Sequence, residues 1–135
     1  MIELRRQLRQ LRKSIDEKTR KEDGQKILRQ CRKNGLFENA KHIAIFIPND
    51  GEIETGDTIK FLKNNGCFVY LPILVEEKLK FAEMGEHFRK NRFGIEEPIN
   101  TPVMEAKQMD LIFMPLVGFD KNKNRLGMGG GFYDK

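Results

Sequence analysis

The sequence is poor in the residues that build metal centres and disulfide frameworks. It has two cysteines, two histidines and no tryptophan among 135 residues. Cys31 and Cys67 lack the spacing of metal ligands and stand in apolar surroundings, so we predict two buried, reduced thiols rather than a disulfide. His42 opens an apolar segment, which favours a structural role. These absences argue against a zinc site.

Long hydrophobic runs are missing as well. No run is long enough to cross a membrane, and the basic start is not followed by the apolar stretch of a signal peptide, so we expect a cytoplasmic protein. Hydrophobic residues make up 39% and charged residues 33% of the chain, which is enough for one domain over 1–135 with a single core. The formal net charge of +5 is compatible with nucleic acid or with a small polyanionic ligand.

The N-terminal part predicts two helices, the first of them basic. The apolar face of the first consists of Leu4, Leu8, Leu11 and Ile15, and the basic face of Arg5, Arg9, Arg12 and Lys13. Ser14 to Glu17 has the pattern of a capping box that opens the second helix. That helix is expected to turn Ile27, Leu28 and Cys31 inward and to end at Asn34 and Gly35.

A strand–helix–strand pattern follows. Residues 42–47 and 67–71 are short apolar segments typical of buried strands, and Thr55 opens a helix that runs to about Asn64. This order predicts parallel strands with a right-handed crossover. Residues 79–81 suggest a half-exposed strand, residues 86–91 an exposed charged segment, and residues 111–114 a third strong strand. The pattern therefore predicts an α/β domain of three layers with a mostly parallel sheet.

The stretch from Arg125 to Lys135 combines four glycines with a cation, two aromatic rings and a carboxylate. Glycines let successive N–H groups face one side and form an anion site. The stretch follows the last predicted strand, where ligands of open parallel sheets bind, and residues 130–134 are suited to begin a helix. The stretch matches neither common phosphate-binding motif. It lacks the lysine followed by serine or threonine that ends a P-loop, and Phe132 stands where the dinucleotide fingerprint needs glycine. The pattern alone leaves the anion unidentified, and a ligand-free tail is the alternative.

Two glutamates form a second candidate site after the first predicted strand. Glu52 and Glu54 are two positions apart, so on an extended chain they point to opposite sides and make a poor acid–base pair. One of them facing a ligand suits two adjacent N–H donors, as on an aminopyrimidinone edge. Two surface glutamates before a helix remain an equal interpretation.

Two segments carry a resemblance to a known family. Leu-Ile-Phe-Met-Pro-Leu-Val-Gly-Phe-Asp at 111–120 and Asn-Arg-Leu-Gly-Met-Gly-Gly-Gly-Phe-Tyr-Asp at 124–134 resemble the signature of the 5-formyltetrahydrofolate cyclo-ligases, also called methenyltetrahydrofolate synthetases. Residues 45–55 resemble the family's folate-side loop. The resemblance covers nearly the whole chain and implies a Rossmann-like open sheet. It also implies ATP- and Mg-dependent cyclisation of 5-formyltetrahydrofolate to 5,10-methenyltetrahydrofolate, with release of ADP and phosphate, through a phosphorylated formyl intermediate.

The resemblance further implies roles for individual residues. Arg125 is expected to be catalytic, Asp134 to bind Mg, Glu52 to hydrogen-bond the pterin and Ile47 to pack on it. The expected ATP-binding residues are Arg5, Arg125, Leu126, Gly127, Met128, Gly129, Gly130, Gly131, Phe132 and Tyr133. Those also expected to line the formyl-bearing part of the folate are Met128, Gly129, Gly130, Gly131 and Phe132. Met1 stands where the family's N-terminal lysine is expected.

One departure from the family concerns the end of the sequence. Family members continue with a segment that adds sheet, helix and a second acidic metal ligand, whereas this sequence stops at Lys135. We therefore expect the chain alone to be impaired as an enzyme, and residues 127–135 to be mobile without a ligand.

Two other function classes compete with the cyclo-ligase. One is a folate- or nucleotide-binding protein without catalysis. The other is a nucleic-acid binder that uses the basic first helix, but basic residues are not interleaved with exposed aromatic residues. We expect small-molecule partners, no nucleic acid and no membrane, and the sequence leaves the oligomeric state open.

Overall fold

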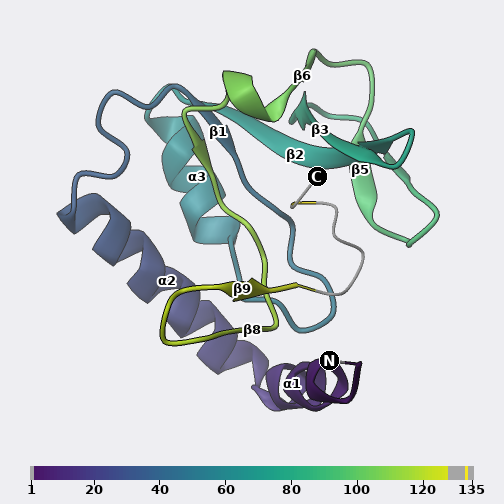
Figure 1. The fold of residues 1–135 in the computed structure, drawn as a ribbon. Helices are drawn as coiled ribbons and strands as arrows, with labels where there is room; N and C mark the ends of the chain where they lie inside the picture. The colour runs from purple at the N-terminus through teal and green to yellow at the C-terminus, as the bar shows by residue number, and fades with distance from the viewer. Residues whose placement is uncertain (1, 128–132, 134–135) are drawn as a thin grey trace.

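A five-stranded sheet with the strand order β6-β3-β2-β1-β7 forms the centre of the molecule (Figure 1). The computed structural model describes residues 2–127 and residue 133. The strands of this sheet are β1 (His42–Ala44), β2 (Phe68–Val75), β3 (Lys78–Glu83), β6 (Val103–Met104) and β7 (Leu111–Ile112). β1 runs parallel to β2 and β7, and β3 pairs antiparallel with both β2 and β6. The predicted α/β architecture with parallel strands at its centre is confirmed.

Both faces of the central strands are buried, as the apolar segments predict. On one face Ile43, Val69 and Leu71 pack against Leu62 of α3 (Gly56–Asn64), which lies between β1 and β2 in the chain. On the opposite face Tyr70 packs with Ala44 of β1 and Phe81 of β3. That second face is covered by η1 (Ala106–Gln108) and the residues around it, so its layer is a single helical turn. β2 continues past the predicted end at residue 71 because residues 70–75 pair with β3.

The capping box predicted at Ser14 is wrong. α1 (Ile2–Ser14) includes this serine, whose hydroxyl donates to the carbonyl oxygen of Leu11. α2 (Glu17–Lys33) is instead capped by Asp16, whose carboxylate accepts the Thr19 N–H at 2.7 Å. An ionised carboxylate is a stronger acceptor than a hydroxyl. The predicted end of this helix at residues 34–35 is confirmed, with Gly35 at φ +67°.

The predicted apolar faces of α1 and α2 are less buried than expected. No side chain of α1 is fully buried, and Leu11 is 63% exposed. The prediction that Ile27 points inward is wrong, since it is 41% exposed. α2 contacts the loop after β1 through Gly24, where an added Cβ would lie 2.2 Å from the Glu54 carbonyl oxygen. The missing side chain of this glycine, rather than an apolar stripe, sets how closely α2 lies on the loop after β1.

Two small hairpins flank the central sheet. β4 (Phe88–Lys90) pairs with β5 (Glu96–Pro98), and β8 (Gly118–Phe119) pairs with β9 (Arg125–Leu126). Residues 86–91, expected to be an exposed charged segment, contain β4. Residues 86–90 are exposed, and Asn91 is half-buried. Figure 1 shows α1 and the β8–β9 hairpin at the same end of the molecule. Within the described residues, no helix has the length and apolar character needed to span a membrane.

The cysteines and His42 have structural surroundings. Cys31 and Cys67 are free thiols, and both are half-buried rather than fully buried as predicted. The Nδ1 of His42 lies 2.8 Å from the Tyr70 hydroxyl, and its ring stacks on Phe68. The described part of the chain contains no group of three or more His, Cys, Asp or Glu side chains that would hold a metal ion.

Candidate active site

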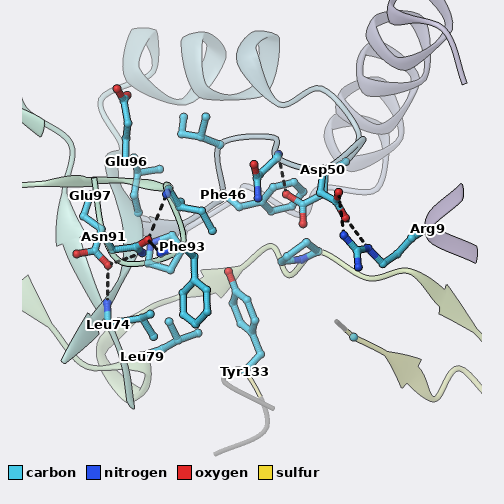
Figure 2. A pocket seen from close by; sticks show the side chains of 18 of the residues that line it. Arg9, Phe46, Asp50, Leu74, Leu79, Asn91, Phe93, Glu96, Glu97 and Tyr133 are labelled. Carbon is cyan, nitrogen blue, oxygen red and sulfur yellow. Dashed lines mark hydrogen bonds and ion pairs between the residues drawn. The ribbon is translucent and has the colours of Figure 1, made fainter. Parts of the chain in front are cut away.

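A cavity of about 680 Å³ opens beyond the carboxyl ends of the parallel strands. Its walls come from the loop after β1, from β2 and β3, from the turn between β4 and β5, and from α1 and β9. Figure 2 shows Arg9 and Asp50 at one end of the cavity, Asn91, Phe93 and Glu97 at the other, and Tyr133 between them. Segments that are far apart in sequence thus contribute to one site.

Arginine side chains line the cavity from two directions. Arg5 and Arg9 come from α1, and Arg125 from β9. The Nε of Arg5 donates to the Gly127 carbonyl oxygen at 3.1 Å, which fastens α1 to the start of the glycine segment. Nη1 of Arg125 donates to the Pro115 carbonyl oxygen at 2.9 Å, and its guanidinium lies 5.4 Å from the Tyr133 ring centroid. This end of the cavity is therefore strongly positive.

Asp50 connects α1 to the loop after β1. Its carboxylate accepts from Arg9 at 2.8 Å, from Arg12 at 3.0 Å and from the Lys13 ammonium at 2.8 Å. Arg12 also donates to the Asp50 and Leu116 carbonyl oxygens. The hydrogen bond from Arg9, more than any other contact, lowers the pKa of Asp50 to about 2. Polar contacts therefore hold α1 in place where apolar burial does not.

Glu52 and Glu54 separate as the sequence predicts. Glu52 lines the cavity, and its Oε1 accepts the Asn49 N–H at 2.9 Å, whereas Glu54 is exposed. Burial raises the pKa of Glu52 above its usual range. Burial and the nearby negative charge of Glu52 raise the pKa of Tyr133 far above its usual value. The Tyr133 phenol is therefore protonated at neutral pH and available as a donor.

The other end of the cavity is mostly apolar. Leu74 and Leu79 from the β2–β3 hairpin and Phe93 and Ile95 from the β4–β5 turn line it. Glu97 is 4% exposed and also reaches the cavity wall. The site thus has a cationic end and an apolar end with a buried carboxylate.

Several predicted site residues come together in this cavity. Those that line it are Arg5, Ile47, Glu52, Arg125, Gly127 and Tyr133. Leu126 lies in β9 and is not among the lining residues. The predictions for Met128, Gly129, Gly130, Gly131, Phe132 and Asp134 lie outside the described residues. The mobility expected for residues 127–135 also remains a prediction.

Sequence reasoning missed part of the site. The sequence places Arg9 on the basic face of a helix, and it assigns no role to Asp50, Asn91, Phe93 or Glu97. The only signal for the last group was a short apolar piece, Phe93 to Ile95, inside a charged region. Its place in the cavity follows from pairing of β4 with β5, which the sequence did not predict.

Comparisons with known proteins identify the family of the chain. The model of the 5-formyltetrahydrofolate cyclo-ligase family matches residues 2–135. A 5-formyltetrahydrofolate cyclo-ligase of Haemophilus influenzae is 44% identical over 103 residues, covering 71% of this chain and 55% of the relative. One of Escherichia coli K12 is 33% identical over 136 residues, covering 95% of this chain and 74% of the relative. The chain thus spans roughly half to three quarters of the length of these two relatives.

Solved structures give the same result for the fold. The 5,10-methenyltetrahydrofolate synthetase of Aquifex aeolicus matches with a TM-score of 0.84 and 25% identity, over 98% of this chain and 69% of that one. The corresponding synthetase of Mycoplasma pneumoniae matches with a TM-score of 0.72 and 28% identity, over 97% of this chain and 73% of that one. Since the family model covers nearly all of the sequence and the fold agrees, the chain belongs to the 5-formyltetrahydrofolate cyclo-ligase family.

Proposed function

We propose that the chain carries out the ATP-dependent cyclisation of 5-formyltetrahydrofolate to 5,10-methenyltetrahydrofolate. The observation that carries the proposal is a single cavity with two unlike ends, in a chain of this family. One end of the cavity is cationic and the other is mostly apolar, and a phosphorylated co-substrate and a folate differ in a matching way. One is polyanionic, and the other has flat rings with N–H donors.

The cationic end suits the phosphates of ATP. Arg5 comes from α1 and Arg125 from β9. Each donates to a backbone carbonyl oxygen, and this hydrogen bond fixes the direction of its remaining donors. Planar guanidinium groups bind phosphate oxygens in pairs. We assign Arg125 the catalytic role of stabilising negative charge on the transferring phosphoryl group. Mg would add positive charge there. Asp134, its proposed ligand, lies outside the described residues.

The apolar end suits the folate rings. Phe93, Leu74 and Leu79 offer flat or aliphatic surface, and Ile47 lies at the loop between the two ends. Glu52, with one oxygen already accepting a backbone N–H, has a second oxygen for the N–H donors of a pterin edge. The raised pKa of Glu52 reflects its burial in this wall.

The proposed reaction has two steps. The formyl oxygen of 5-formyltetrahydrofolate attacks the γ-phosphorus of ATP, and ADP leaves. The folate N10 then attacks the formyl carbon and loses its proton, the carbon–oxygen bond breaks, and phosphate leaves as the ring closes. Phosphorylation is needed because an amide oxygen is otherwise a poor leaving group. The protein contributes positioning and charge stabilisation, which dominate phosphoryl transfer.

The test is formation of methenyltetrahydrofolate from 5-formyltetrahydrofolate, followed spectroscopically with and without ATP and Mg. Arg125→Ala should lower kcat/KM about 100-fold, as for loss of one charge-stabilising donor. Arg89→Ala is the matched control, because Arg89 is exposed on β4 and does not line the cavity. Unchanged turnover in Arg125→Ala would contradict the assigned role.

The same assay separates the competing functions. If the chain forms no product but calorimetric titration shows binding of 5-formyltetrahydrofolate or ATP, it is a binding protein without catalysis. The nucleic-acid hypothesis is weakened by the contacts of α1. Arg9, Arg12 and Lys13 all contact Asp50, which neutralises part of the basic face.

A further inference from the structure

Glu97 is a buried carboxylate whose described hydrogen-bond donors are uncharged. Its Oε2 accepts the Leu74 N–H at 2.7 Å and the Asn91 side-chain amide at 3.1 Å. Among the described residues, no ion pair involves Glu97, although it is only 4% exposed. A buried carboxylate without a cation is costly unless donors satisfy it. An apolar residue would serve stability at least as well, which favours a role for Glu97 in positioning the groups it contacts.

Asn91 transmits the contact to the turn between β4 and β5. Its side-chain oxygen accepts the Phe93 N–H at 2.9 Å and the Ile95 N–H at 3.2 Å. The backbone closes the same turn, since the Asn91 N–H donates to the Ile95 carbonyl and the Gly94 N–H to the Asn91 carbonyl. Gly94 has φ +75°, a conformation that glycine adopts without strain. Glu97 fixes which way the Asn91 amide faces, because only its NH₂ group is able to donate to the carboxylate.

The turn carries Phe93 to the apolar end of the cavity. The Phe93 backbone is held by Asn91, and Figure 2 shows its ring on the same side of the cavity as Leu74 and Leu79. The Leu74 N–H that Glu97 accepts belongs to β2, in the central sheet. Glu97 therefore connects the turn to the central sheet.

We propose that Glu97 is a positioning residue for the folate end of the site. Acting through Asn91, it holds the turn so that the Phe93 ring stands against the bound folate. The proposal rests on the proposed function for its ligand. It assigns Glu97 no contact with folate, and what matters is its accepting oxygen rather than its charge.

The kinetic test compares three variants with a matched control. Glu97→Leu removes the acceptor, and Asn91→Asp removes the donor and sets two carboxylates together. Each should raise the KM for 5-formyltetrahydrofolate about tenfold with the KM for ATP unchanged, the size expected for one displaced contact. Glu97→Gln keeps an accepting oxygen and should restore most of the wild-type KM. Glu86→Leu is the control, because Glu86 is exposed before β4 and does not line the cavity.

A second measurement needs no turnover. The chain has no tryptophan, so Phe93→Trp introduces a single fluorescent reporter at the ring in question. In that background, Glu97→Leu and Asn91→Asp should shift the emission to the red and increase quenching by acrylamide, whereas Glu97→Gln should not. If the reporter responds but the chain neither binds nor converts folate, the positioning role stands and the proposed function fails.

Three results would overturn the proposal. One is a reporter whose emission is the same in all variants. Another is a rise in the KM for ATP equal to the rise for folate, which indicates a general loss of structure. The last is a rise in the KM for 5-formyltetrahydrofolate as large in Glu97→Gln as in Glu97→Leu, since that would indicate that the charge of Glu97 interacts directly with the ligand.

Discussion

The two ends of the cavity are anchored by different chemistry. The loop after β1 is held through Asp50, which contacts three cations of α1. The turn between β4 and β5 is held through Glu97, whose described donors are a backbone amide and an asparagine side chain. Asp50 keeps partial access to solvent, with 15% of its side chain exposed, whereas Glu97 is 4% exposed. Carboxylates are central to both anchors, but one is ionic and the other is not.

The difference predicts how each end responds to its surroundings. Interactions of charges near solvent are screened by salt and disappear when the carboxylate is protonated. Hydrogen bonds from neutral donors to a buried carboxylate are less sensitive to salt. The phosphate end should therefore loosen at high salt before the folate end does.

The largest effect is expected where the loop after β1 contacts α2. An added Cβ at Gly24 would lie 2.2 Å from the Glu54 carbonyl oxygen, so Gly24→Ala must push the helix and the loop apart. We expect a loss of about 3 kcal/mol in the free energy of unfolding, the upper range for overpacking. Urea denaturation measures it.

A neighbouring glycine provides the control. At Gly56, the nearest atom to an added Cβ is the Glu54 carboxylate oxygen at 3.5 Å, an ordinary contact. Gly56→Ala should therefore be neutral or slightly stabilising in the first turn of α3. Equal stability of the two variants would contradict the close contact between Gly24 and the Glu54 backbone.

Asp50→Asn should have the next largest effect. Asparagine tolerates the Asp50 backbone conformation, φ +55°, so the change removes mainly charge. We expect a loss of about 1–2 kcal/mol in the free energy of unfolding at pH 7. Because folding lowers the pKa of Asp50 to about 2, this stabilisation is present above the unfolded pKa of about 4 and is lost as the pH falls towards 2.

The measurement is urea denaturation of wild type and variant at pH 7, 4 and 2.5, with low and high salt. The difference between them should shrink as the pH falls and as salt rises. Asp23→Asn is the control, because the Asp23–Lys26 pair is exposed and should contribute at most about 0.5 kcal/mol. A difference that stays constant with pH would contradict an ionic anchor.

The central strands show what periodicity predicts well. Residues 42–47 and 67–71 are apolar without alternation, and residues 43–46 and 69–71 are buried as that pattern predicts, whereas Ile47 and Phe68 are exposed. The helix boundaries near residues 34 and 55 were also predicted, since glycine and threonine mark them locally. These features depend on short-range interactions or on bulk hydrophobicity.

The helices and the site show where sequence reasoning fails. The apolar face of α1 reads as a buried stripe, but the helix is held by Asp50, which lies 37 or more residues away in the chain. Glu97 and Phe93 meet the cavity only because β4 pairs with β5. Contacts of this kind depend on tertiary geometry, which periodicity in one sequence does not encode.

The smallest effect concerns Thr55, which sharpens the contrast because it is a neutral anchor at the ionic end. The sequence predicts a helix cap here, and Thr55 does precede α3, but its hydroxyl makes no capping bond. It donates instead to the Phe46 carbonyl oxygen at 2.7 Å and is 6% exposed. Thr55→Val keeps the shape and should cost about 1 kcal/mol in the free energy of unfolding. Unlike the loss in Asp50→Asn, this loss should be the same at low and high salt. A salt-dependent loss in Thr55→Val would show that the two kinds of anchor are coupled through the loop rather than independent.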